Sequence, residues 1–251
     1  FYCWGQAGVV LFSTLFFSLF SLSNWRILAG IWAVLPLFDA FLFLRVPLNK
    51  PVKDGEGATL RELFSDPTFL CLALLIFCAG AAELGMSQWA SAFAEKSLGV
   101  EKSIGDLAGP CLFGLFTGAV RLLYSLLSRR VSLPAFMTVS GILCLAAYLL
   151  ASLAPHPGVN LAACALCGFS VGVLWPGALS LSARLCPRGG TLMYGLFAVA
   201  GDLGCIIGTG TVGFVADRFG GNLKMGMLVA SVFPLLLLLG LLLCAPRLRA
   251  V

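Results

Sequence analysis

Apolar stretches of about twenty residues recur along almost the whole chain, with short polar segments between them. A helix of about this length crosses the hydrocarbon core of a bilayer and satisfies its own backbone polar groups there. The pattern predicts eight membrane-spanning helices, at residues 4–23, 26–46, 68–93, 105–127, 133–154, 159–183, 191–216 and 224–245. So many spans leave little of the 251 residues for a water-soluble domain. We therefore expect an all-α polytopic protein whose principal partner is the lipid bilayer.

One long polar segment, residues 47–67, interrupts this rhythm after the second predicted span. Its residues 59–62 read TLRE, a capping-box pattern, and apolar residues follow at 63 and 64. A short amphipathic helix on the membrane surface is therefore expected there. Asp66 and Pro67 suit the N-cap and the first turn of the next span. The chain divides into residues 1–46, a linker at 47–67, and residues 68–251.

If the spans alternate in direction, basic side chains gather on one side of the membrane. That side carries Arg45, Lys50, Lys53, Arg61, Arg129, Arg130, Arg184, Arg188, Arg247 and Arg249. The opposite side carries Arg26, Lys96, Lys102, Arg218 and Lys224, offset by Glu95, Glu101, Asp106 and Asp217. The positive-inside rule then places the linker and the C-terminus in the cytoplasm, in a multi-pass protein of the inner or plasma membrane.

Composition supports a membrane protein and argues against several other classes. Hydrophobic residues make up 60% of the chain and charged residues 11%, against roughly 25% charged in soluble domains. The net charge of +5 is explained by orientation in the membrane, and no nucleic-acid partner is expected because no basic cluster alternates with exposed aromatics. The ten cysteines lie mostly in apolar spans, as small hydrophobes rather than a disulfide framework. With one histidine, His156, in a Pro-His-Pro loop, neither a metal site nor a cofactor is expected.

Several local patterns resemble one transporter family. Two spans, a long basic linker and six further spans resemble the major facilitator superfamily, in which a cytoplasmic linker joins two six-helix bundles. Residues 60–69 (LRELFSDPTF) resemble the start of its seventh helix, and residues 83–89 (ELGMSQW) resemble that helix in fucose-permease-like sugar transporters. Residues 118–121 (GAVR) with 127–130 (LSRR) resemble a cytoplasmic loop motif, and residues 201–204 (GDLG) resemble the eleventh helix.

This resemblance implies helices five to twelve: the last two helices of the N-terminal bundle and the complete C-terminal six-helix bundle. The first four helices would be missing partners, and this chain alone is not expected to transport. Ser128 stands where the loop motif usually has Asp, and Thr209 where Pro is frequent. Residues 213–220 (GFVADRFG) also resemble the loop motif and would invert the orientation, but the distribution of charge opposes that alternative.

Charged residues at lipid depth require a partner or a water-filled cavity, at a cost of roughly 2.5–3.5 kcal/mol each. Glu83 lies near the middle of its predicted span, and Gln88 lies about a turn further out. They could line a polar cavity in which Glu83 accepts a proton or binds a hydroxylated substrate. Alternatively, Glu83 is a structural carboxyl paired with a neighbouring helix.

Arg121 and Asp202 also fall inside predicted spans. An ion pair of Arg121 with Asp202 or with Glu83 would offset desolvation and could act as a conformational switch. Alternatively, the Arg121 side chain extends to the cytoplasmic surface.

Pro176 interrupts the sixth span and frees the carbonyl of Gly172, so a kink is expected beside Trp175. Trp175 could stack on the face of a sugar, and the alternative is simple helix curvature. Two pairs of small residues four apart suit close helix packing more than binding: Gly114 with Gly118, and Gly204 with Gly208.

We therefore predict a transporter of a small solute, with a sugar as the candidate, that works by alternating access and is either coupled to protons as a symporter or facilitative. No glycine-rich nucleotide loop is present, so the energy is expected from an ion gradient or from the solute itself. An enzyme is not expected, because no pair of catalytic groups lies at one depth. A non-transporting scaffold or an intramembrane enzyme remains the alternative.

Overall fold

The computed structural model describes residues 2–20, 25–46 and 57–248, and all regular secondary structure in these ranges is helical. This confirms the all-α expectation. The elements are α1 (Tyr2–Phe20), α2 (Trp25–Phe43), α3 (Leu60–Ser65), α4 (Pro67–Ser87), α5 (Ala90–Ala92), η1 (Phe93–Ser97), α6 (Lys102–Asp106), η2 (Leu107–Cys111), α7 (Leu112–Leu127), α8 (Leu133–Leu153), α9 (Pro157–Val171), α10 (Leu174–Leu185), α11 (Gly190–Arg218), α12 (Leu223–Ala230) and α13 (Val232–Leu248).

Seven segments of the described chain are long and apolar enough to span a membrane, against the eight that the sequence predicts. They are Trp25–Phe43, Pro67–Ser87, Lys102–Leu127, Leu133–Leu153, Pro157–Leu185, Gly190–Arg218 and Leu223–Cys244. In α1 the described apolar stretch Ala7–Ser18 is shorter than these. The protein is therefore an integral, multi-pass membrane protein.

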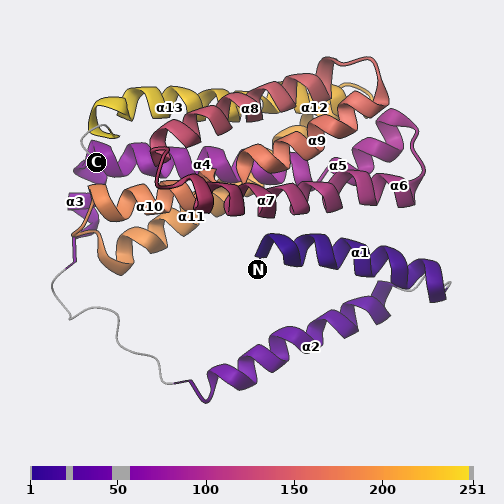
Figure 1. The fold of residues 1–251 in the computed structure, drawn as a ribbon, viewed down its shortest axis with the longest axis horizontal. Helices are drawn as coiled ribbons and strands as arrows, with labels where there is room; N and C mark the ends of the chain where they lie inside the picture. Colours follow the sequence, from indigo (N-terminus) through magenta and orange to yellow (C-terminus); the bar gives the residue numbers. More distant parts are fainter. Residues whose placement is uncertain (1, 21–24, 47–56, 249–251) are drawn as a thin grey trace.

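The helices from α4 to α13 form an elongated bundle, α1 runs beside it, and α2 diverges from it (Figure 1). Loops meet at the two ends of this bundle. At one end the amide of Ala58 donates to the carbonyl of Arg188 at 2.9 Å, which joins the segment before α3 to the α10–α11 loop. At the other end Lys224 Nζ donates to the carbonyl of Ala154 at 3.0 Å. These contacts agree with spans that alternate in direction.

The start of α4 has the caps that the sequence predicts. Thr59 and Glu62 form the capping box of α3: the Thr59 amide donates to Glu62 Oε2 at 2.7 Å, and the Glu62 amide donates to Thr59 Oγ1 at 3.3 Å. The hydrogen bonds from Thr59 lower the pKa of Glu62. Asp66 caps α4 through Thr68, with Pro67 in the first turn. The rest of the predicted linker, residues 47–56, lies outside the described residues, as do residues 21–24 and 249–251.

The hydrophobic core surrounds α4, and the backbone of α4 lies close to the backbone of α11. A Cβ atom at Gly204 would overlap the carbonyl oxygen of Phe77, and one at Gly208 would overlap that of Ala81. Only glycine permits such contact, as in the small-residue seams of membrane helices. The α4–α11 pair thus forms a tightly packed wall.

Several predicted spans are interrupted rather than continuous. The span predicted at 159–183 is two helices, α9 and α10, separated by Gly172 and Val173. The span predicted at 105–127 includes the π-helical segment η2, which contains Pro110. A proline removes a backbone donor, so neighbouring carbonyls must find other partners.

One pair of cysteines departs from the expectation that the cysteines act as small hydrophobes. Cys71 on α4 and Cys244 on α13 form a disulfide, with their Cα atoms 6.9 Å apart. Both lie in apolar helices that pack side by side, and sequence spacing alone cannot reveal such a pair because 173 positions separate them. Seven other cysteines whose side chains the structure describes are free, and five of them are buried.

Candidate functional site

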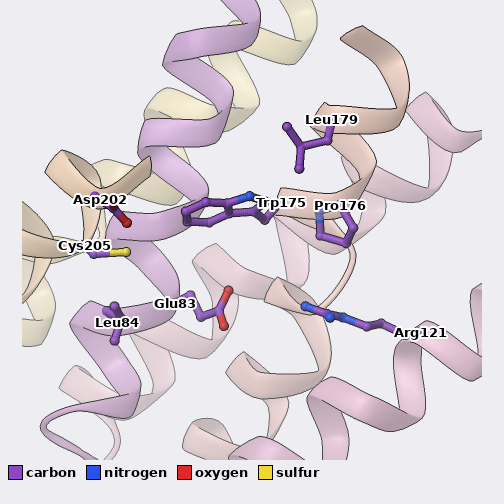
Figure 2. Close-up of a pocket in the computed structure, with 8 residues that line it drawn as sticks. All are labelled: Glu83, Leu84, Arg121, Trp175, Pro176, Leu179, Asp202 and Cys205. Atoms are coloured by element: carbon purple, nitrogen blue, oxygen red, sulfur yellow. The ribbon is translucent and has the colours of Figure 1, made fainter. Parts of the chain in front are cut away.

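A cavity of about 320 Å³ opens between α4, α7, α10 and α11. Five of the residues that the sequence singles out lie in its wall, joined by two apolar residues and one thiol. The lining residues are Glu83, Leu84, Arg121, Trp175, Pro176, Leu179, Asp202 and Cys205 (Figure 2). Four helices therefore bring together two carboxylates, a guanidinium and an indole.

Glu83 projects from α4 toward the centre of this group, with its carboxyl between Trp175 and Arg121 (Figure 2). The side chain is half-buried, and the positive charge of Arg121 attracts it. Neutralising or pairing this charge offsets the cost of holding it at lipid depth. Glu83 can therefore interact either with the Arg121 guanidinium or with a solute in the cavity.

Arg121 does not form the predicted ion pair. Among the described residues, Arg121 Nε donates a hydrogen bond to the carbonyl oxygen of Gly172 at 2.7 Å, and no carboxylate oxygen lies within 4.0 Å of the guanidinium. Neither Asp202 nor Glu83 is thus a direct partner in this conformation. The side chain is half-buried, and its hydrogen bond goes to the carbonyl freed at the α9–α10 break.

Trp175 lies in the first turn of α10 and forms part of the cavity wall, and two glycines leave space for its ring. The ring carbon Cζ3 would lie 3.2 Å from a Cβ at Gly80 on α4, and the ring edge would overlap a Cβ at Gly201 on α11. The indole therefore wedges between α4 and α11 and is only half-buried. Large aromatic faces of this kind bind apolar faces of ligands well.

Asp202 extends from α11 toward Trp175, one turn before Cys205 (Figure 2). The Asp202 side chain is exposed in the protein, whereas Gly201 and Gly204 beside it are buried against α10 and α4. The helix therefore presents its glycine face to the bundle and its carboxylate to the cavity.

The sequence profile of the Major Facilitator Superfamily matches residues 1–209. The chain belongs to the Major Facilitator Superfamily. A comparison with curated proteins finds no match. Members of the superfamily are generally transporters of small solutes rather than enzymes, and this chain is accordingly a membrane transporter of small solutes. The cavity lies among its membrane-spanning helices, as such a role requires.

In this superfamily member, Gln88 lies apart from the cavity of Glu83. It lines a second cavity of about 220 Å³, together with Val10, Ser87, Ser91, Pro110 and Phe113. Gln88 lies five residues after Glu83 and is therefore rotated away from it around the helix, and with Ser87 it faces Val10 of α1 and Pro110 of η2. Glu83 and Gln88, which the sequence predicts in one polar cavity, therefore line two different cavities.

The four predicted packing glycines are all buried. Gly204 and Gly208 contact the backbone of α4, and Gly114 and Gly118 are buried in α7. A further contact with α7, made by Gly168 of α9 and by Gly172 directly after α9, is not among the predicted ones. A Cβ at Gly172 would lie 2.7 Å from the Thr117 carbonyl oxygen. Gly168 and Gly172 are four residues apart, the same spacing as in the two predicted glycine pairs.

The described residues of this transporter contain no group of three or more His, Cys, Asp or Glu side chains that could hold a metal ion. Cys164 and Cys167 are fully buried in α9, and Cys164 Sγ contacts Met86 Sδ at 3.7 Å. Their surroundings are those of packed core residues.

Proposed function

We propose that this superfamily member carries a small hydroxylated, sugar-like solute across the membrane by alternating access, coupled to protons. The observation that supports this most is the cavity in which Glu83, Arg121 and Asp202 surround the half-buried ring of Trp175. Solute sites of transporters lie between helices near the middle of the membrane. The volume of about 320 Å³ lies at the lower end of the range for small-molecule sites.

The chemistry of the wall favours a polar, ring-shaped solute. Carboxylates accept hydrogen bonds from hydroxyl groups, and a guanidinium donates several in a fixed plane. The indole of Trp175 offers a flat apolar face for the carbon side of a sugar ring. Leu84 and Leu179 complete the wall with apolar surface. A hydroxylated ring could thus place its polar edge and its apolar face against matching groups.

Glu83 is our candidate for the proton-carrying group. It is half-buried on α4, at the meeting point of the cavity and the Arg121 charge, with no cation within 4.0 Å among the described residues. Protonation removes a charge that is costly at lipid depth, and solute hydroxyls could then bind the neutral acid. Energy would come from a proton gradient, which suits a symporter.

The orientation of the chain follows from its charges. Described basic residues Arg61, Arg129, Arg130, Arg184 and Arg188 belong to the linker end of the bundle. We propose that this end and the C-terminus face the cytoplasm, in the plasma membrane or its bacterial equivalent.

The test is Glu83→Gln, which keeps shape and hydrogen bonding but cannot carry a proton. Cells expressing the full-length protein would receive a panel of radiolabelled hexoses and deoxyhexoses, with and without an imposed proton gradient. We expect accumulation against a gradient to disappear in Glu83→Gln while exchange of external for internal solute continues. The matched control is Glu95→Gln, an exposed carboxylate near the loop end of η1. Normal uphill accumulation by Glu83→Gln would refute the role.

A further inference from the structure

The joint between α9 and α10 leaves one backbone carbonyl without its helical donor. In a continuous helix the carbonyl of Gly172 would accept from the N–H of residue 176, but residue 176 is proline. The helix α9 ends at Val171, and α10 begins at Leu174. Helical bonding resumes where the amide of Gly177 donates to the Val173 carbonyl at 2.8 Å. Within the membrane, the freed carbonyl needs a donor from elsewhere.

Arg121 of α7 supplies that donor, through Nε at 2.7 Å. The contact is possible because Gly172 lacks a side chain: a Cβ there would lie 2.5 Å from Val120 Cγ1 and 2.7 Å from the Thr117 carbonyl oxygen. One turn earlier, the Thr117 hydroxyl lies 2.9 Å from the Gly168 carbonyl oxygen and 2.8 Å from that of Phe113. Two α7 side chains thus contact carbonyls that lie four residues apart, those of Gly168 and Gly172.

The same guanidinium also faces the cavity. Its charge attracts Glu83, and the residues directly after the joint, Trp175 and Pro176, form part of the cavity wall (Figure 2). The bend at Gly172 therefore sets the position of the Trp175 indole. A single side chain connects the charge of the cavity to the joint that positions its aromatic wall.

We propose that the Arg121–Gly172 hydrogen bond is a latch that holds the α9–α10 joint bent, and that its release lets α10 and Trp175 move as the cavity changes the side to which it opens. Arg121 is then a positioning residue of the transport cycle. Groups that compete for the guanidinium, such as Glu83 or a polar solute atom, favour release. The inference rests on the proposed function only in taking this movement to be part of transport.

The test needs no solute. Hydrogen–deuterium exchange would be measured by mass spectrometry on the protein in lipid nanodiscs, over the amides of residues 173–180. Arg121→Met removes the latch, and exchange in this segment should rise about tenfold or more, as expected for loss of a charge-assisted hydrogen bond. Pro176→Ala restores an N–H for the Gly172 carbonyl and should lower exchange.

The decisive comparison is the double variant. With Ala at position 176, the Gly172 carbonyl has a helical donor, so adding Arg121→Met should change exchange by less than about twofold. An equal rise in both backgrounds would overturn the latch, because it would show that Arg121 acts only as a cavity charge. Thr117→Ala is the matched control on the same seam, since Thr117 contacts the Gly168 carbonyl, one turn before the joint. It should leave residues 173–180 unchanged.

Two further results keep the test decisive. If Arg121→Met does not fold, Arg121→Gln and Pro176→Ala carry the comparison, and an unchanged exchange rate in Pro176→Ala would count against the latch. Exchange over α8 serves as the internal reference and should not change. If Glu83→Gln refutes proton coupling while these exchange results hold, the latch stands and only the proposed coupling fails.

Discussion

Two helix–helix contacts border the cavity, the α4–α11 seam and the α7–α9 seam, and different interactions hold them together. Along α4–α11, glycines bring backbones into van der Waals contact, with Gly204 against Phe77 and Gly208 against Ala81. Along α7–α9, glycines also allow close approach, but polar side chains of Thr117 and Arg121 bond to the exposed carbonyls. Close packing is lost all at once when helices separate, whereas a hydrogen bond can exchange one partner for another. We infer that the first seam acts as a fixed wall and the second as the movable one.

The largest effect is expected from a side chain forced into the fixed seam. Gly204→Leu would drive a Cβ into the Phe77 carbonyl and separate α4 from α11. We expect a loss of at least about 3 kcal/mol in the free energy of unfolding, the upper end for overpacking. The measurement is the midpoint of SDS-induced unfolding in mixed micelles.

Gly210→Leu provides the control for that variant. Gly210 lies on the same helix, where a Cβ meets no described atom within 4 Å. Its unfolding midpoint should stay close to that of the original protein. Similar losses in both variants would show that α11 tolerates no added bulk anywhere, and the contrast between the two seams would fail.

A smaller loss is expected on the movable seam. Gly172→Ala adds one methyl group that would lie 2.7 Å from the Thr117 carbonyl oxygen, where a small helix shift can relieve the overlap. We expect about 1–3 kcal/mol of destabilisation, together with faster amide exchange at residues 173–180 because Arg121 is displaced. Gly195→Ala on α11 adds its methyl group to open space and should be neutral or slightly stabilising. Unchanged stability in Gly172→Ala would mean that this seam is already loose.

The smallest effect concerns the linker end, where the α10–α11 loop contacts the start of α4. Cys186 Sγ lies 3.7 Å from Asp66 Oδ2, and burial together with that carboxylate raises the pKa of the Cys186 thiol to about 11. Since the thiolate is the reactive form, alkylation of Cys186 should be slow at neutral pH and keep rising with pH until about pH 11.

Asp66→Asn tests the part of this shift that comes from charge. Asn keeps the N-cap of α4 but removes the negative charge, so alkylation at pH 8 should become severalfold faster, as followed by peptide mass spectrometry. Burial, the larger cause, remains and limits the gain. Asp217→Asn, at the far end of α11, is the control and should have no effect. A rate that levels off near pH 9 in the original protein would contradict the assigned environment.

Much of the cavity could be predicted from the chain, because charged residues inside apolar spans are rare and costly. Glu83, Arg121 and Asp202 were identified in this way, and Pro176 with Trp175 by the break that proline imposes. The structure brings all five into one wall. Gln88 was predicted to line the same cavity and does not, because five residues of helix rotate it away from Glu83 and toward α1.

The partner of Arg121 illustrates what the sequence could not supply. Pairing by charge favoured Glu83 or Asp202, yet the guanidinium bonds to a carbonyl that Pro176 had freed 51 residues further along than Arg121. Both facts were visible separately in the sequence. Their connection required knowing that Gly172 faces Val120 and Thr117 across α7 and α9.

The sequence by itself determined that the chain is helical, crosses the membrane repeatedly and has capped boundaries at Thr59 and Asp66, because these features depend on hydropathy and on residues close together in the chain. Only the tertiary structure decided which helices touch, which carbonyl Arg121 binds and which cysteines pair. Contacts between helices depend on how each helix is rotated about its axis and how deep it lies in the membrane. A repeating apolar pattern determines neither, because every face of such a helix is apolar enough to contact lipid.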